Sequence, residues 1–219
     1  MDLKEAIKER HSVREFTDQV IDEETRQKLN EVVKKANEES GLNIEIRYDE
    51  PEGFDSKLAH YGKFRNVRNY IVIKGPESDS FEEDCGYYGE MIVLHAQMWG
   101  LNTCWAGLTY NKKMVSRLVS EGEKLLLVIA LGYGKTQGGP RKCKSVKDVT
   151  MTKGAMPDWF MEGTVAALLA PTAMNQQKFV VGMIGGEPAI RIKGIGPYTK
   201  TDLGIVKYHF ETASGRKVR

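Results

Sequence analysis

Hydrophobic residues recur every three or four positions in several parts of the chain, a spacing that predicts amphipathic helices. Such helices are predicted over residues 2–10, 23–38, 82–99, 112–119 and 159–169. The helix over 82–99 has few polar faces, and Gly100 behind it suits a helix end. We therefore expect this helix at the centre of the fold.

Shorter apolar segments indicate β-strands. Residues 44–48 alternate between polar and apolar side chains, as in a strand with one wet face. Residues 69–73 and 124–131 are almost continuously apolar and predict buried strands, and a further strand is expected over 178–184. Residues 135–150 are rich in Gly, Lys and Arg, so we interpret them as a surface crossing.

The last third of the chain repeats the order of an earlier part. Helix 159–169 followed by strand 178–184 parallels helix 23–38 followed by strand 44–48. Asp202-Leu203-Gly204 also opens an apolar helix in the same way as Asp84-Cys85-Gly86. We interpret this pattern as a partial internal duplication. The predicted organisation is one compact unit with a first half, 1–150, and a shorter second half, 151–219.

Composition excludes several classes of protein. The 219 residues are 41% hydrophobic and 28% charged, which is enough to form a sizeable core. Thirty-two basic against 30 acidic residues leave a net charge of +2, so no nucleic-acid partner is expected. No apolar run is long enough to span a membrane. The charged N-terminus lacks the features of a signal peptide, and three widely spaced cysteines suit a cytoplasmic protein.

The histidines and cysteines do not indicate a metal site. None of the four histidines has metal-ligand spacing with Cys or carboxylate residues. His95 and His209 lie on apolar helices and are interpreted as core histidines with satisfied hydrogen bonds. Cys104 has no identifiable His or Asn partner, so it is interpreted as a small packed residue. Gly194-Ile195-Gly196-Pro197 lacks the third glycine of a dinucleotide-binding fingerprint.

A candidate anion site lies where the first helix ends. Arg10, His11, Ser12 and Arg14 bring two guanidiniums, an imidazole and a hydroxyl together within five residues. Arginine offers a planar pair of donors to phosphate oxygens, and serine adds a neutral donor. A solvated basic turn is an equally good interpretation of this spacing alone.

Four segments together carry a family resemblance. They are R-x-S-x-R with Phe16, Gly100–Gly107 at the end of the central helix, Ala130–Tyr133 at a strand end, and Ala170–Gln177. In combination they resemble the FMN-dependent nitroreductase family. The resemblance implies an α+β sandwich in which helices flank a central antiparallel or mixed sheet, with FMN bound noncovalently.

The resemblance also implies which residues bind FMN. Those near the phosphate, the ribityl chain and the pyrimidine edge would be Arg10, His11, Ser12 and Arg14. Those along the ring would be Trp105, Ala106 and Gly107, with a backbone N–H near Gly107 at flavin N5. Basic residues that complete the phosphate site would be Arg141 with Lys142 or Lys144. No catalytic side chain is expected beyond the flavin, since flavin N5 carries the reaction.

One segment departs from the family pattern. In typical members an A-P-S-x-x-N-x-Q segment lies early in the chain and reaches across a homodimer to the partner's flavin. Here its best copy is near the C-terminus and supplies Pro171, Thr172, Ala173, Asn175 and Gln176. We therefore expect a single chain that mimics the dimer, binds one FMN, and is a monomer or pairs again as a homodimer.

The implied reaction is NADH- or NADPH-driven hydride transfer to a small acceptor. A nitroaromatic, a quinone or a conjugated enone is the expected acceptor class. Tyr61, Lys63 and Phe64 form a polar and aromatic segment that is a candidate cover for the substrate side. Two alternatives from other classes are a protein that stores FMN without turnover and a degenerate interaction module.

Overall fold

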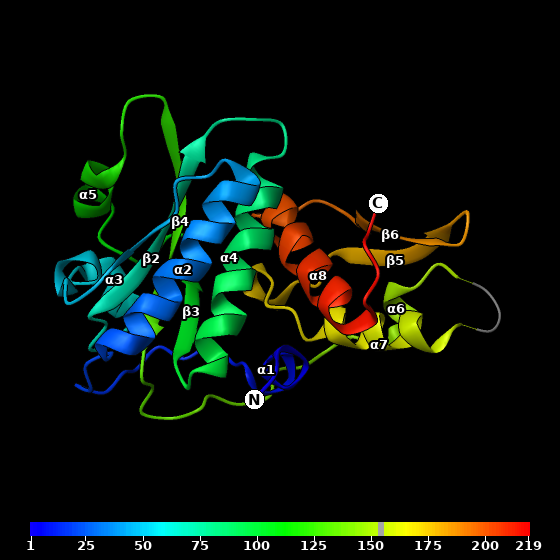
Figure 1. Cartoon of the computed structure of the whole chain (residues 1–219), viewed down its shortest axis with the longest axis horizontal. Coiled ribbons are helices and arrows are strands. Elements are labelled where there is room, and N and C mark those ends of the chain that lie inside the picture. The colour runs from blue at the N-terminus through cyan, green and yellow to red at the C-terminus, as the bar shows by residue number, and fades with distance from the viewer. Residues whose placement is uncertain (153–155) are drawn as a thin grey trace.

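The computed structural model describes residues 1–152 and 156–219 (Figure 1). Its α-helices are α1 (Leu3–Glu9), α2 (Glu23–Ser40), α3 (Lys57–Tyr61), α4 (Phe81–Met98), α5 (Lys112–Val115), α6 (Val146–Val149), α7 (Asp158–Leu168) and α8 (Thr199–Ser214). Its strands are β1 (Glu45–Arg47), β2 (Asn69–Pro76), β3 (Asn102–Ala106), β4 (Glu123–Gly132), β5 (Phe179–Ile184) and β6 (Glu187–Ile192). Short 3₁₀ turns lie at Pro51–Gly53, Ser116–Leu118 and Ala173–Asn175.

The main sheet is antiparallel throughout, with strand order β1-β2-β4-β3. Helices α2 and α4 cover one of its faces (Figure 1). Along β2, Ile71 and Ile73 belong to the core under these helices, whereas Tyr70 and Val72 belong to a second core on the other face. Because both faces are buried, the central strands are apolar without alternation. These features confirm the predicted α+β class with an antiparallel sheet and flanking helices.

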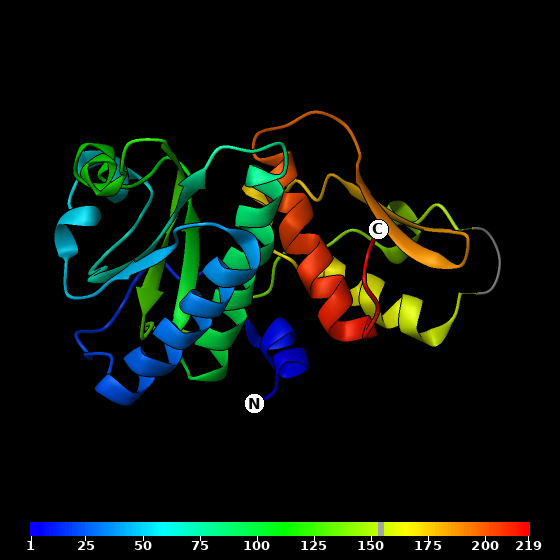
Figure 2. The same ribbon diagram turned by 45° about the horizontal axis from the view of Figure 1, so that its top comes forward.

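Helices α4 and α8 lie side by side through the middle of the molecule (Figures 1 and 2). Two glycines allow their backbones to meet. A Cβ atom on Gly86 would overlap the carbonyl oxygen of Thr201, and one on Gly204 would overlap that of Glu83. Lys207 on α8 also donates to Glu83 on α4 through its Nζ. The helix over 82–99 is therefore central, as predicted.

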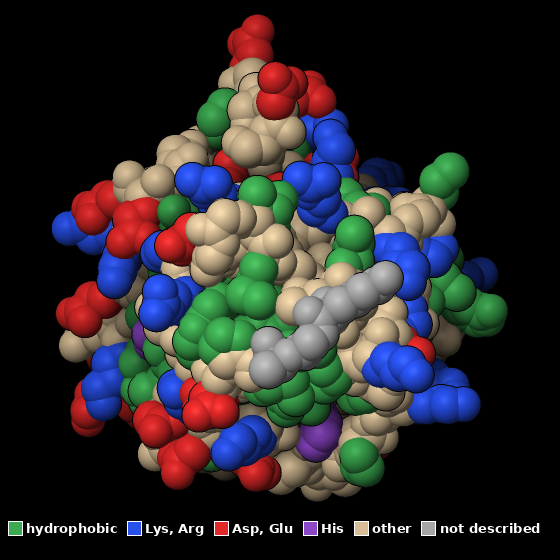
Figure 3. Space-filling view, turned by 90° about the vertical axis from the view of Figure 1, so that its right-hand side faces the viewer, with side chains coloured by type: hydrophobic (Ala, Val, Ile, Leu, Met, Phe, Trp, Pro, Cys, Tyr) green, Lys and Arg blue, Asp and Glu red, His purple; other side chains and the backbone are tan. Residues whose placement is uncertain are grey.

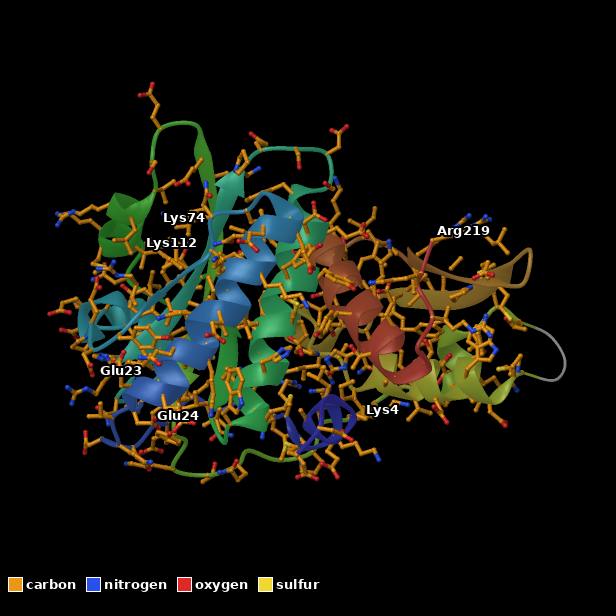
Figure 4. All side chains as sticks on the ribbon, in the orientation of Figure 1. Lys4, Glu23, Glu24, Lys74, Lys112 and Arg219 are labelled. Atoms are coloured by element: carbon orange, nitrogen blue, oxygen red, sulfur yellow. The ribbon has the colours of Figure 1, made fainter. Side chains whose placement is uncertain are left out.

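The second half has its own small core. Strands β5 and β6 form an antiparallel hairpin that packs with α7 and α8 around Phe160, Val181 and Phe210. The C-terminal tail returns to this hairpin, where the Arg219 N–H donates to the Pro188 carbonyl at 3.1 Å (Figure 4). Lys4 on α1 pairs with Glu162 on α7 at 3.5 Å, so the N-terminal helix also contacts this half.

Hydrophobic side chains also gather on the outer end of the second half (Figure 3). Large exposed apolar residues of this half include Met151, Val165 and Ile184. No helix in the part of the chain that the structure describes is both long enough and apolar enough to cross a membrane.

Several short elements differ from the sequence-based expectation. Strands β3 and β6 and helix α3 were not predicted, and the helix expected over 112–119 is a single turn followed by a 3₁₀ turn. The crossing over 135–150 contains α6, because Ser145 and Asp148 form a reciprocal capping box around its first turn. Helices α3 and α5 are too short for a helical period to identify them.

Gly204→Ala is expected to lower the free energy of unfolding by about 1–3 kcal/mol, because the added methyl group meets a backbone carbonyl that cannot rotate away. Urea denaturation measures this change. Gly182→Ala on β5 is the matched control, because its Cβ atom would lie 3.9 Å from that of Met151, an ordinary contact. Equal effects of the two substitutions would contradict the close crossing of α4 and α8.

Candidate functional site

A cavity of about 560 Å³ lies between the two halves of the chain. In the first half its walls come from the segment after α1, from β3 with residues 107–109, and from the crossing over 135–150. In the second half they come from residues 171–175 before β5 and from the start of α8. The lining residues used below are His11, Ser12, Arg14, Trp105, Ala106, Gly107, Arg141, Pro171, Thr172, Ala173, Asn175, Tyr198 and Asp202. Most of the residues predicted from the sequence to bind the cofactor therefore line one cavity.

A short parallel β contact positions the part of the cavity wall that belongs to the first half. Helix α1 ends at Arg10, and the chain then runs beside β3, where the Val13 N–H donates to the Thr103 carbonyl at 3.0 Å. Ser12 forms an isolated parallel bridge with the same residue. This contact places the basic segment next to Trp105, although the two are more than 90 residues apart in the sequence.

Two arginines beside the cavity have side-chain nitrogens that find no hydrogen-bond partner among the described residues. Arg10 lies behind the cavity wall with only 1% of its surface exposed, and the two nitrogens without a partner are Nε and Nη2. Its Nε atom is 3.7 Å from Oε1 of Glu90, beyond hydrogen-bond distance. Burial lowers the pKa of Arg10 to about 10. Arg141 lines the cavity, its Nε is also unpartnered, and burial lowers its pKa. Buried donors without an acceptor are costly, so the two arginines favour an anionic ligand.

The segment from Pro171 to Gln177 is held by hydrogen bonds on both sides. On the α8 side, Asp202 accepts from the Ala173 N–H at 2.8 Å and from Nε2 of Gln176 at 2.7 Å. On the crossing side, Asn175 Nδ2 donates to the Lys142 carbonyl at 2.8 Å. The segment therefore bridges the crossing and α8, and it presents Pro171 and its neighbours to the cavity.

Three predicted residues brace this segment and do not line the cavity. Gln176 Nε2 also donates to the Pro197 carbonyl at 2.8 Å, and the Lys144 ammonium donates to the Gln177 carbonyl at 2.7 Å. Lys142 contributes its backbone carbonyl. Tyr61, Lys63 and Phe64 also lie outside the lining of this cavity, and Phe64 is buried in the second core. The predicted cofactor roles of Lys142, Lys144 and Gln176 stay predictions.

Backbone strain concentrates at the same wall. Met174, Asn175 and Gln177 have φ between 45° and 54°, and Tyr198 has φ of 55°. Residues other than glycine adopt this left-handed conformation at a cost, which is typical of functional sites. The Tyr198 hydroxyl donates to the Gly107 carbonyl at 3.1 Å, and a Cβ atom on Gly107 would overlap the tyrosine ring. Tyr198 thus packs directly on the residue expected to meet flavin N5.

Tyr198 and Asp202 are among the cavity residues that the sequence does not identify as site residues. In the sequence, Tyr198 follows an incomplete dinucleotide fingerprint, and Asp202 marks only a helix start. Asp202 is 7% exposed, and burial raises its pKa to about 6 although hydrogen bonds from Gln176 and Ala173 act in the opposite direction. A shifted carboxyl group in a cleft is a recognisable signal of a site, but it requires the structure.

The structure also shows the surroundings of Cys104, His95 and His209. Cys104 is buried, and burial raises the pKa of its thiol, so it behaves as a packed residue. His209 is fully buried with partners for both ring nitrogens, which confirms its interpretation as a core histidine. His95 is only partly buried, and its Nδ1 atom lies 2.7 Å from the Met91 carbonyl oxygen. Among the described residues, no group of three or more His, Cys, Asp and Glu side chains could hold a metal ion.

Solved structures share this fold. A structure described as a "putative nitroreductase" from Thermotoga maritima is 24% identical, with a TM-score of 0.69 over 97% of this chain and 83% of that chain. A "putative nitroreductase in complex with FMN" from Desulfovibrio desulfuricans is 16% identical, with a TM-score of 0.55 over 72% of this chain and 99% of that chain.

A third similar structure, a "Putative NADH dehydrogenase/NAD(P)H nitroreductase" from Parabacteroides distasonis, is 22% identical, with a TM-score of 0.54 over 67% of this chain and 95% of that chain. No curated protein matches the sequence. The family model described as "Putative TM nitroreductase" matches residues 2–214. Because this match spans almost the whole sequence, the chain belongs to that nitroreductase family.

Proposed function

We propose that this protein is an FMN-dependent oxidoreductase. It would take hydride from NADH or NADPH and pass it, in a second step, to a nitroaromatic, a quinone or a conjugated enone. The observation that carries the proposal is the pair of buried, unpartnered arginines, Arg10 and Arg141, beside a cavity of about 560 Å³. The volume is in the range of cofactor sites, and the FMN complex of the Desulfovibrio protein supports the choice of cofactor.

The chemistry of the cavity fits FMN. A phosphate group would supply the acceptors that Nε and Nη2 of Arg10 and Nε of Arg141 lack. The apolar side of the lining, which includes Ala106 and Pro171, suits a flat ring. When bound, FMN supplies the hydride chemistry, since it accepts two electrons from a nicotinamide and returns them to an acceptor. Arg14 offers a cation for the negative charge of the reduced ring.

The chain would form this site alone, as a single-chain equivalent of a dimer. The contact of α4 with α8 is reciprocal: Gly86 meets Thr201 while Gly204 meets Glu83, and each contacted residue lies three positions before the other glycine. Such reciprocity is the mark of a two-fold interface. Helix, strand, strand and helix also occur in this order in α2, β1, β2 and α4, with α3 inserted between the two strands, and in α7, β5, β6 and α8. The second half has no copy of the Arg10 segment, so we propose one FMN per chain.

Asp202 would anchor the wall that the second half contributes. It binds the segment around Ala173 and Gln176 through both carboxylate oxygens, and so fixes the part of the cavity that a partner subunit would supply in a dimer. Tyr198, one helical turn earlier, would limit access to Gly107. These residues orient the cofactor and the substrate, which is the protein's contribution when a cofactor carries the reaction.

The visible spectrum of the purified protein tests the proposed function. We expect an oxidised-flavin spectrum at one FMN per chain that bleaches with NADH or NADPH under anaerobic conditions and returns with a quinone. Light scattering during size exclusion reports the number of chains per particle at the same time. Absence of flavin after incubation with FMN would refute the proposal, and bound flavin that no nicotinamide reduces would favour a storage protein.

Arg10→Met and Arg141→Met should each weaken FMN binding by at least about tenfold, because each removes a charge-assisted hydrogen bond worth about 1.5–3 kcal/mol. Quenching of flavin fluorescence gives the dissociation constant. Arg117→Met, at an exposed position in the 3₁₀ turn after α5, is the control and should leave binding unchanged. Unchanged binding in the two cavity variants would exclude the arginines as the phosphate site.

Asp202 should make stability depend on pH. Its folded pKa of about 6 lies above the ordinary value of 3.8, so the folded chain holds this proton more tightly than the unfolded chain. The stabilisation is complete below pH 4 and is lost as the pH rises through about 6, a change of about 3 kcal/mol. The difference in unfolding free energy between wild type and Asp202→Asn should fall by about 2–2.5 kcal/mol from pH 4 to pH 7, because the unfolded carboxyl is already partly ionised at pH 4.

Urea titrations at several pH values measure this difference. Asp84→Asn, at the corresponding position of α4, is the matched control. A difference for Asp202→Asn that is constant across this pH range would contradict the assigned shift.

A further inference from the structure

A polar cluster is buried between α4, α8 and the end of α1. It consists of Arg10, Glu90, Trp105 and His209, and we call it the Glu90 cluster. Glu90 and His209 are fully buried, and Arg10 is 1% exposed. Trp105 belongs both to this cluster and to the cavity wall. The cluster therefore connects the second half, through His209, with the proposed phosphate site.

The hydrogen bonds of His209 require an additional proton. Its Nδ1 atom lies 3.0 Å from the Ala166 carbonyl oxygen, and its Nε2 atom lies 2.8 Å from Oε1 of Glu90. A carbonyl oxygen only accepts, and a carboxylate oxygen only accepts. A neutral imidazole carries one N–H and would leave one of these contacts without a hydrogen. The pair must therefore hold a second proton, either on the imidazole or on the Glu90 carboxyl group.

In both arrangements the Glu90–His209 pair has no net charge. The other oxygen of Glu90, Oε2, accepts from the Trp105 indole N–H at 3.0 Å. Both carboxyl oxygens thus have short contacts that do not involve Arg10, whose Nε remains 3.7 Å away. Glu90 therefore attracts Arg10 across 3.7 Å but accepts no hydrogen bond from it, and Nε and Nη2 of the arginine remain free donors among the described residues.

The titratable groups around the Glu90–His209 pair do not change its net charge. The nearby titratable groups are Arg10, Arg141, Cys104 and Tyr208. Burial raises the pKa of both Cys104 and Tyr208, so these two groups are uncharged near neutral pH. Arg10 and Arg141 therefore remain as the charged groups beside the pair, and their sign suits a phosphate group.

We infer that His209 is a positioning residue for the phosphate site. By sharing a proton with Glu90, it prevents that carboxylate from capturing Arg10, and so it keeps the guanidinium available for the phosphate of the cofactor. This inference rests on the proposed binding of FMN. It gives the second half a role in cofactor binding that is separate from the cavity wall formed by residues 171–175.

Substitutions at both members of the pair test the inference. In His209→Gln, Glu90 keeps its charge without the shared proton and can pair with Arg10, so FMN should bind roughly tenfold more weakly. In the double variant Glu90→Gln, His209→Gln, no carboxylate remains to compete, and the affinity should return to within about threefold of wild type. His95→Gln on α4 is the matched control and should bind FMN like wild type.

The outcomes distinguish failure of the inference from failure of the proposed function. Wild-type protein that does not bind FMN refutes the proposed function. Wild-type binding together with equally weak binding in the single and double variants overturns the inference, because His209 would then be needed only for packing. Circular dichroism and thermal melts show whether each variant is folded.

If His209→Gln does not fold, nuclear magnetic resonance of the wild-type protein tests the inference instead. Nitrogen-15 shifts of the His209 ring and the carbon-13 shift of the Glu90 carboxyl locate the proton without any substitution or cofactor. A doubly protonated ring, or a neutral ring beside a protonated carboxyl, supports the inference. A neutral ring beside an ionised carboxylate at neutral pH overturns it.

Discussion

The close contact of α4 with α8 is the constraint on which the rest of the structure depends. Gly86 and Gly204 let backbone meet backbone, and this approach brings the second half near enough to form a cavity wall. A side chain at either glycine would separate the helices and open the cavity between the halves. The same contact buries the Glu90–His209 pair, one member on each helix, at a distance of 2.8 Å. Fold and site therefore share one packing requirement.

The second constraint is the burial of charged groups, and it applies at the same interface between α4 and α8. Burying a charged group without a partner is costly, so natural proteins pair such groups or use them for a ligand. Glu90 and His209 are paired with each other, whereas Arg10 is buried without a hydrogen-bond partner among the described residues. This arrangement is the basis for the proposed anion site. The strained backbone at Met174 and Tyr198 is a further local cost at this site.

The longer elements and half of the residues that line the cavity could be predicted from the sequence. The central helix was expected over 82–99 and lies at Phe81–Met98, because a long apolar pattern depends little on tertiary context. Short elements such as β3 and β6 were missed, since each depends on a partner strand that is distant in the sequence or joined by a turn. His209 was interpreted as a core histidine, but the pattern on one helix could not reveal Glu90 as its partner 119 residues away.

The sequence by itself determined the class of fold, the family resemblance and the motifs at Arg10–Arg14, Trp105–Gly107 and Pro171–Gln176. These signals are local, because a residue's periodicity or its spacing from its neighbours is fixed by the chain. Only the tertiary structure decided that Arg10 is buried and unpartnered, that Lys144 braces a loop, and that Tyr198 and Asp202 line the cavity. The reason is physical: hydrogen-bond partners, burial and shifted pKa values arise from groups that meet only when the two halves pack together.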